Sequence, residues 1–190
     1  RWVKTHPLGY GAYLSEQNEE HGCKVVPLIK MLKRWRDAQM IYRRPKSYWL
    51  ECLVVRHISK GWVTTDGKSY AALFAELLAS IEADFSQAFQ DQEAAPPEIP
   101  DPMLGNNVAW NWKRAEFETF MRRLGESRRL ADRALEAEQE ADAVELWQRV
   151  FNRDDEEFFP TAVESTLSSI SRAAKAGRPL HVTASGAVLL

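Results

Sequence analysis

The feature that most constrains the fold is an apolar side chain at every fourth position between residues 73 and 89. The side chains in this series are Leu73, Leu77, Ile81, Phe85 and Phe89. In an α-helix of 3.6 residues per turn, this spacing places all of them along one face. Because a stripe this apolar is stable only when it is covered, we predict a core helix over about 69–89, with other segments packed against it.

The same periodicity predicts helices through most of the chain. A stripe at positions i, i+3, i+4 and i+7 marks a helix over about 24–40; it consists of Leu28, Met31, Leu32 and Trp35. Pro7 and Gly22 are placed to start and stop an earlier helix over about 7–20, and Gly61 to stop another over 47–60. Later apolar faces predict a helical hairpin, with Phe117, Phe120, Met121, Leu124, Ala131 and Leu135 in its first helix and Ala143, Leu146, Trp147, Val150 and Phe151 in its second.

Prolines divide the chain. Residues 91–107 cannot form a regular helix, because proline lacks the backbone donor that a helix needs; the prolines are Pro96, Pro97, Pro100 and Pro102. We therefore interpret 91–112 as an ordered Pro-rich connector that crosses a surface, between helices in 1–90 and the hairpin in 113–160. Residues 161–190 are expected to form a weakly ordered tail. The predicted fold class is mainly α, with one or two short strands near the start if part of a sheet is included.

Composition excludes several classes of protein. The chain has 190 residues, of which 45% are hydrophobic and 27% charged, which suits one soluble globular domain or a lobe of a larger protein. No apolar run approaches the ~20 residues that a membrane helix needs. Cys23 and Cys52 lie in apolar helical sequence outside any CxxC pair, so we expect reduced thiols in a cytoplasmic protein. The four histidines lack metal-ligand spacing, and we predict no zinc.

Positive charge is concentrated in one short stretch. Between Lys30 and Lys46 there are seven basic side chains and the single acid Asp37, although the net charge of the whole chain is −2. A local cluster of this size favours a compact anion over a long nucleic acid. The alternative is structural, because the apolar stripe of this helix leaves Lys30, Lys33 and Asp37 on a face that solvent would cover.

A second helix begins just after this stretch. Pro45 disfavours a helical conformation at Arg44, so the helix can start near Lys46 or Ser47. Ser47 would then be either an ordinary N-cap or part of a phosphate site, because the free amides at a helix start and a lysine on a neighbouring helix both attract phosphate. The residue pattern leaves these two roles open.

A series of motifs in a fixed order resembles the C-terminal half of a bacterial CBASS oligonucleotide cyclase, a family similar to cyclic GMP-AMP synthase and oligoadenylate synthetase. The motifs are Trp2 with His6-Pro7, Lys33-Arg34-Trp35, Lys46-Ser47-Tyr48 with Glu51, Pro100-Asp101-Pro102, Asn106-Asn107, Trp112, Trp147, Phe151 and Phe159-Pro160. The resemblance covers roughly residues 2–160. It implies a helical lobe packed against a nucleotidyltransferase core that joins nucleoside triphosphates (NTPs) such as ATP and GTP into a cyclic second messenger for anti-phage defence.

The resemblance also implies roles for particular residues. Lys33 matches the lysine that contacts the donor triphosphate, and Ser47 matches a hydroxyl that contacts the same phosphates. Tyr48 matches the ring that stacks on a base, a contact worth ~1–3 kcal/mol. Lys46 is an additional candidate, for which surface charge is the alternative explanation. Trp49 is expected to point into the core.

One part of the family pattern is missing. These enzymes carry a Gly-Ser turn and three carboxylates that bind two Mg²⁺ ions, and no Gly-Ser turn followed by Asp-x-Asp occurs in this sequence. Two-metal phosphoryl transfer requires such carboxylates. With its start at Arg1, the chain looks like the middle of a longer protein, so we expect the upstream catalytic core on another segment or polypeptide. This chain alone is expected to be inactive.

Two other functions belong to different classes. A non-catalytic helical adaptor could dock an acidic protein partner through the basic stretch, and it would show no selective effect of nucleotides. A nucleic-acid binder has less support, because the net charge is −2 and the basic stretch is short.

Overall fold

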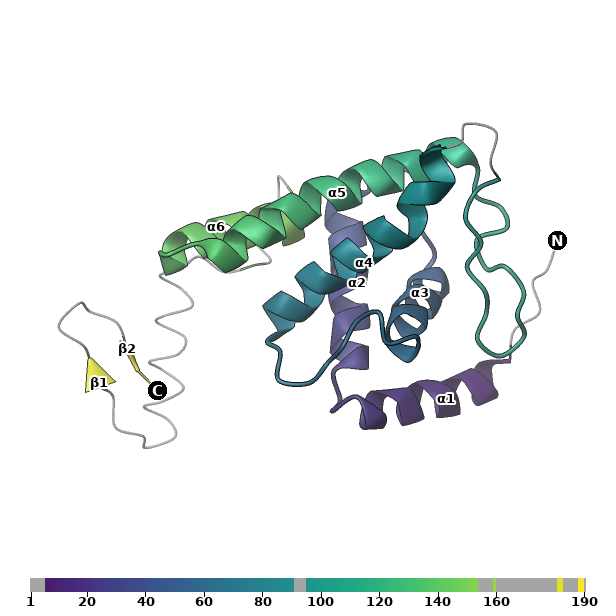
Figure 1. Ribbon diagram of the computed structural model, residues 1–190, viewed down its shortest axis with the longest axis horizontal. Helices are drawn as coiled ribbons and strands as arrows, with labels where there is room; N and C mark the ends of the chain where they lie inside the picture. Colours follow the sequence, from purple (N-terminus) through teal and green to yellow (C-terminus); the bar gives the residue numbers. More distant parts are fainter. Residues whose placement is uncertain (1–5, 91–94, 154–158, 160–180, 183–187, 190) are drawn as a thin grey trace.

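The computed structural model describes residues 6–90, 95–153, 159, 181–182 and 188–189, which are mainly α-helical (Figure 1). The helices are α1 Pro7–Glu20, α2 Val25–Gln39, α3 Ser47–Ser59, α4 Tyr70–Gln90, α5 Arg114–Glu136 and α6 Glu140–Phe151. The strands β1 His181–Val182 and β2 Val188–Leu189 form an antiparallel pair. The mainly α fold class predicted from periodicity is confirmed.

The elements near the start and end differ in part from the expectation. Residues 7–20 form α1, so the strands considered near the start do not occur in the described part of that region. Of the predicted tail 161–190, the structure describes only the four residues that form β1 and β2; the rest lies outside the described residues. Cys23 is not helical: it is exposed in the turn between α1 and α2, where φ is 60° after Gly22 at 61°. Two successive left-handed residues reverse the chain direction between these helices.

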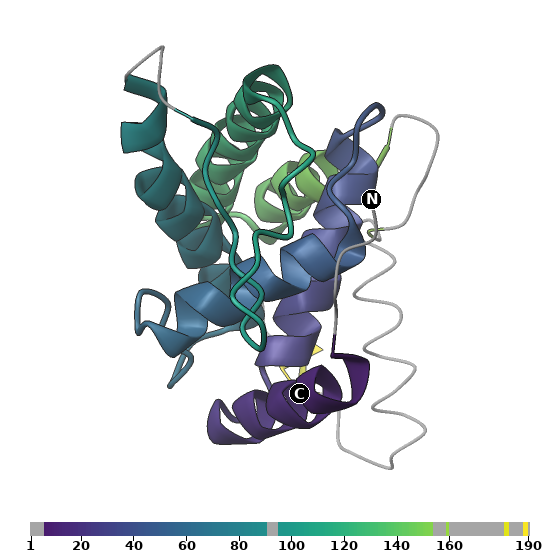
Figure 2. The same cartoon turned by 90° about the vertical axis from the view of Figure 1, so that its right-hand side faces the viewer.

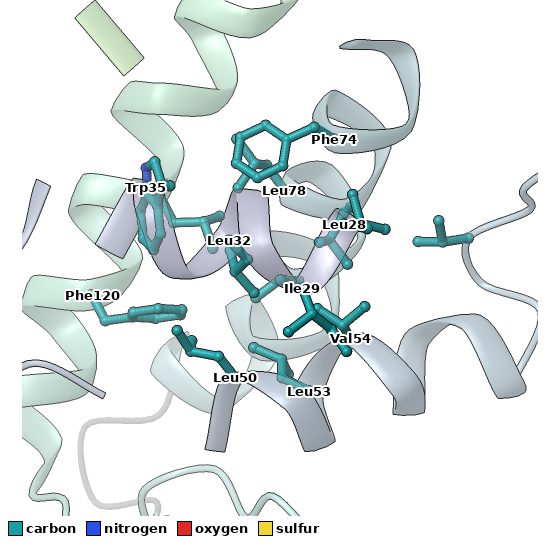
Figure 3. Close-up of a cluster of buried hydrophobic side chains, with 14 of the residues drawn as sticks. Leu28, Ile29, Leu32, Trp35, Leu50, Leu53, Val54, Phe74, Leu78 and Phe120 are labelled. Carbon is teal, nitrogen blue, oxygen red and sulfur yellow. The ribbon is translucent and has the colours of Figure 1, made fainter. Parts of the chain in front are cut away.

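Helix α2 lies at the centre of the fold and packs against α1, α3, α4 and α6. Its residues Leu28, Leu32 and Trp35 are fully buried, as the periodicity predicts. Figure 3 shows these side chains meeting Leu50 and Leu53 of α3, Phe74 and Leu78 of α4, and Phe120 of α5. Since residues from separate parts of the sequence fill one core, the positions of the helices packed on α2 depend on its stripe.

The long helices α4 and α5 pack side by side, and α6 folds back against α5 at the side of the molecule opposite α1 (Figure 1). Leu73, Leu77 and Ile81 of α4 are fully buried, which confirms the predicted core helix. The prediction is wrong at one position of the α5 stripe, because Leu135 is 46% exposed and Ala134 is buried instead. Alternating steps of three and four keep a stripe in line on a helix, and Ala134 continues that series from Ala131.

The Pro-rich connector was predicted to cross a surface, but parts of it are buried in the core. Its residues 95–112 run across α3 (Figure 2), and Ile99 and Ala109 are buried in the core. An antiparallel bridge joins Pro100 to Asn107, and the Val108 amide donates to the Ile99 carbonyl at 2.8 Å. These contacts satisfy backbone groups that would otherwise be costly to bury, so the apolar side chains between the prolines can enter the core. The described helices include none long and apolar enough to cross a membrane.

The first prediction concerns Trp35, whose indole Nε1 donates to Ser127 Oγ at 2.8 Å and whose ring meets Phe120 edge-on at 5.5 Å. Replacing Trp35→Ala leaves a cavity and an unpaired buried hydroxyl, so we expect the free energy of unfolding to fall by about 3–5 kcal/mol. Urea denaturation measures this value. The control Tyr42→Ala removes an aromatic side chain that is 85% exposed and should change stability by less than about 0.5 kcal/mol. Equal losses for both variants would contradict the central position of α2.

Candidate functional site

Two of the predicted residues, Lys33 and Ser47, lie along the facing sides of α2 and α3. Lys33 and Arg36 are three residues apart on α2, and Ser47 and Glu51 are four apart on α3, so each pair shares one helix face. The Lys33 Nζ atom is 2.6 Å from Glu51 Oε1, and Arg36 Nη1 donates to Ser47 Oγ at 3.2 Å. The arrangement forms a row in which two cations of α2 meet polar groups of α3.

Ser47 is not an N-cap. The capping position of α3 is Lys46, whose backbone is extended, and Ser47 is the first helical residue. The helix therefore starts one residue earlier than a serine cap requires. Arg36 Nη1 also donates to the Pro45 carbonyl at 2.9 Å, which holds the entry to α3 against α2. The Ser47 hydroxyl is exposed and faces the cations of α2.

Acidic side chains neutralise much of the remaining basic stretch. Arg43 pairs with Glu116 at 3.1 Å, and Arg44 lies 3.6 Å from Asp37. Lys46 is exposed and forms no ion pair with any residue that the structure describes. The local positive charge inferred from sequence is therefore partly compensated, and the Lys33 ammonium is already engaged by one carboxylate.

A cavity of about 370 Å³ opens beside the start of α3. Its lining residues come from the N-terminal end of α1, from α3 and from the connector: His6, Pro7, Tyr10, Lys46, Tyr48, Trp49, Val108 and Trp110. Aromatic rings dominate this wall, and Lys46 supplies a cation at its edge. A mainly apolar pocket with a few polar groups suits a flat organic ring. Tyr48 and Lys46 thus lie together in one cavity, which Lys33 and Ser47 do not line.

The Tyr48 ring is held in a fixed orientation. Its hydroxyl donates to Asp101 Oδ2 at 2.8 Å, and its ring meets Tyr10 edge-on with centroids 4.8 Å apart. Asp101 is only 1% exposed, and its other oxygen accepts from the Met103 and Leu104 amides. Burial and the Asp101 contact raise the pKa of the Tyr48 hydroxyl, so it remains a donor at neutral pH. Asp101 therefore fixes the ring against the connector.

Tyr10 contributes an aromatic ring to the wall of the same cavity. The side chain is 7% exposed, and its hydroxyl has no hydrogen-bond partner among the residues that the structure describes. Burial, together with the nearby Glu51 carboxylate, raises the pKa of this hydroxyl. Because this hydroxyl is shielded from solvent near Glu51, the part of Tyr10 that lines the cavity is its ring.

Sequence reasoning missed several residues of this site. Arg36 could have been found, because it lies one helical turn after Lys33. Tyr10 and Trp110 had no local signal, since the cavity joins segments separated by about a hundred residues. Asp101 belongs to a motif quoted above, but its contact with Tyr48 depends on how the connector folds.

A cluster of ionisable groups joins α3 to α4. His57 Nδ1 lies 2.7 Å from Ser80 Oγ, and His57 Nε2 lies 3.6 Å from Asp84 Oδ2. The same three residue types form the triad of serine hydrolases. Here the imidazole is fully buried and the distance to Asp84 exceeds a hydrogen bond, so no substrate reaches the ring. Arg56 bonds Asp84 at 3.1 Å, and the cluster is a structural tie between the helices.

The part of the chain that the structure describes brings together no group of three or more His, Cys, Asp or Glu side chains able to hold a metal ion. Two-metal phosphoryl transfer needs several carboxylates around the ions. The residues described here do not fit that requirement, so no step of a mechanism is assigned to a metal on them. The Mg²⁺ site expected on an upstream core stays a prediction.

Curated relatives share sequence with most of this chain, whereas no model of a known protein family matches it. The cyclic AMP-AMP-AMP synthase of an Acinetobacter strain is 30% identical over 151 residues, which is 78% of this chain and 42% of that protein. The cyclic AMP-AMP-GMP synthase of Enterobacter hormaechei is 24% identical over 152 residues, or 79% of this chain and 38% of that protein. The chain thus spans about two fifths of the length of these relatives, in their C-terminal part.

Solved structures show the same fold. The E. coli CdnC in its complex with HORMA-deltaN matches with a TM-score of 0.61 and 17% identity, over 80% of this chain and 52% of CdnC. The Vibrio cholerae dinucleotide cyclase DncV, in complex with ATP and GTP, matches with a TM-score of 0.58 and 16% identity, over 82% of this chain and 38% of DncV. At these identities the likeness concerns the arrangement of helices.

The pH dependence of stability follows from the His57 cluster. Burial, followed by the charges of Arg56 and Lys60, lowers the pKa of His57 to about 4. The unfolded state, with a histidine pKa of about 6.5, binds more protons than the folded state between these values, so stability falls as pH falls from 6.5 to 4. We expect a loss of up to about 3 kcal/mol. Asp84, whose pKa is raised mainly by burial, offsets part of it on acidification.

Urea denaturation between pH 4 and pH 7.5 measures this dependence. His57→Gln removes the titrating group, so its stability should change much less over the same range. A profile as steep in His57→Gln as in the unmodified chain would assign the acid sensitivity to other groups.

Proposed function

Because this chain belongs to the family of bacterial cyclic oligonucleotide synthases and matches their C-terminal part, we propose that it is the helical lobe that holds a nucleoside triphosphate. The observation that carries the proposal is the aromatic cavity at the start of α3, adjacent to the Lys33–Glu51 and Arg36–Ser47 contacts. An aromatic wall suits a base, and neighbouring cations suit its phosphates.

In this proposal each residue has a distinct part. Tyr48 offers its ring to the base, and the Tyr10 ring supports it edge-on. Lys33 and Ser47 contact the phosphates, with Arg36 as a second cation one turn further along α2. Lys46 is exposed at the cavity edge, where its charge can meet either the phosphates or solvent.

Glu51 has a particular consequence for phosphate binding. Its carboxylate lies 2.6 Å from the Lys33 ammonium, so a triphosphate must share or replace this partner. Glu51 also keeps the lysine side chain ordered in the free lobe, because the ion pair is only partly exposed. The ammonium is therefore positioned beside α3 before a ligand arrives, and the carboxylate lowers its affinity for phosphate.

The remaining parts of the reaction belong to the proposed whole protein. An upstream nucleotidyltransferase core would bind Mg²⁺ and catalyse the joining of NTPs into a cyclic oligonucleotide, and this chain alone would be inactive. The setting would be CBASS anti-phage defence in the cytoplasm. Support comes from the relatives, which are cyclic AMP-AMP-AMP and cyclic AMP-AMP-GMP synthases.

Substitutions at Lys33 test the phosphate contact. A charge-assisted contact contributes about 1.5–3 kcal/mol, so Lys33→Ala should weaken ATP binding roughly tenfold or more and AMP binding much less. Glu51→Gln should instead strengthen triphosphate binding, because it removes a negative charge from beside the phosphates. Isothermal titration calorimetry measures both. Equal losses for ATP and AMP in Lys33→Ala would contradict the assigned contact.

Substitutions at Tyr48 test the base contact. Tyr48→Ala removes the ring and should weaken ATP binding by roughly 5- to 150-fold, from a stacking contribution of ~1–3 kcal/mol. Binding of tripolyphosphate, which has no base, should be almost unchanged. Tyr48→Phe is the matched control, since it keeps the ring and loses only the hydroxyl that donates a hydrogen bond to Asp101. If Tyr48→Ala weakened the binding of ATP and of tripolyphosphate to a similar extent, Tyr48 would support the fold and would not stack on a base.

The decisive experiment for the whole proposal is binding of ATP and GTP with Mg²⁺ to this chain, alone and mixed with the upstream core, followed by analysis of products. Selective triphosphate binding, with oligonucleotides formed only in the mixture, supports the proposal. Absence of both would favour the alternative of a helical adaptor that docks an acidic protein partner.

A further inference from the structure

A second set of cavities lies away from the Tyr48 cavity, between the C-terminal end of α2 and the helices α5 and α6. One cavity of about 510 Å³ is lined by Ala38, Gln39, Ile41, Arg123, Glu145, Gln148, Arg149, Asn152 and Arg153. An adjoining one of about 480 Å³ is lined by Gln39, Arg123, Glu126, Ser127, Arg129, Leu130, Arg133 and Arg149. Because Gln39, Arg123 and Arg149 line both, we call the two together the arginine groove. It shares no lining residue with the Tyr48 cavity.

The arginine groove has an excess of positive charge. Besides Arg153, four arginines line it, against the carboxylates of Glu126 and Glu145. Arg123 pairs with Glu126 at 3.2 Å, whereas Arg149 and Arg133 form no ion pair with any residue in the described ranges. A neighbouring cavity shares Arg133, Glu145 and Arg149 with the groove and adds the acids Glu136 and Asp142, so the excess of positive charge is smaller at that end.

The walls of the groove are held by contacts that do not use the guanidinium groups. Gln39 Nε2 donates to the Arg149 and Val150 carbonyls at 2.8 and 3.0 Å, which ties the end of α2 to α6. Ser127 is buried and accepts from Trp35 of α2. The backbones that carry Arg123 and Arg149 are therefore fixed relative to each other. Two guanidiniums held across a concave surface lose less freedom on binding an anion than two on an open helix.

We propose that the arginine groove binds a small polyanion with several phosphate or carboxylate groups, at a site separate from the Tyr48 cavity. Guanidinium groups bind both kinds of oxyanion through paired hydrogen bonds, and each cavity has the volume of a small-molecule site. A small ligand fits the concave shape, which distinguishes this site from a flat basic surface for a protein or nucleic acid. The site is independent of the function proposed above.

The test is calorimetric titration of the 190-residue chain carrying Lys33→Ala with tripolyphosphate, at low and at physiological salt, so that the phosphate contact proposed at Lys33 does not mask the groove. The variant Arg123→Gln with Arg149→Gln removes the two cations that both cavities share. The matched control, Arg122→Gln with Lys30→Gln, removes the same charge from exposed positions outside the groove; Arg122 contacts the same Glu126 at 3.0 Å. We expect at least about tenfold weaker binding in the groove variant and less than about a twofold change in the control.

Two further measurements make the result specific. In Lys33→Ala, tripolyphosphate should still bind the groove, so loss of all binding in that variant would overturn a separate site. Equal weakening in the groove variant and its control would also overturn it, because net charge alone would then explain the binding. Titration with citrate distinguishes the ligand classes: binding lost in the groove variant extends the site to polycarboxylates, and a lack of citrate binding restricts it to phosphates.

Discussion

The contact on which the proposed nucleotide site most depends is the packing of Trp49 on α3. Its ring stacks on Trp112 of the connector with centroids 5.2 Å apart, and it meets Phe120 of α5 edge-on at 5.1 Å. Trp49 directly follows Ser47 and Tyr48, so this aromatic contact sets where the first turn of α3 lies. The burial of one tryptophan thus connects the hydrophobic core to the residues proposed to bind the ligand.

The connector has a second role beyond filling the core. Its Asp101 accepts a hydrogen bond from the Tyr48 hydroxyl, and its Val108 and Trp110 complete the wall of the cavity. A ring anchored at its hydroxyl by a buried carboxylate loses little freedom when a base stacks on it, which favours binding. The prolines that prevent a helix in this segment therefore allow the folded loop that shapes the site.

Charge compensation explains why the basic stretch is less basic in the folded chain than in the sequence. Glu51, Glu116 and Asp37 each contact one or more of its cations. Glu116 lies on α5, far from Arg43 in sequence, so this contact requires the tertiary fold. By contrast, the groove cations Arg149 and Arg133 are spread over two helices and give no cluster in the sequence.

The spacing of apolar side chains was enough to predict the helices, because such side chains must be buried. The stripes of α2 and α4 and the core position of Trp49 were all predictable. The sequence also identified Lys33, Ser47 and Tyr48 as candidates, through a family resemblance that the relatives support. Only the tertiary structure decided that Tyr48 and Lys46 share a cavity with Tyr10 and Trp110, that Arg36 and not a cap contact engages Ser47, and that the connector enters the core. The physical reason is that spacing along a helix fixes which side chains share a face, whereas contacts between distant segments depend on how those faces pack.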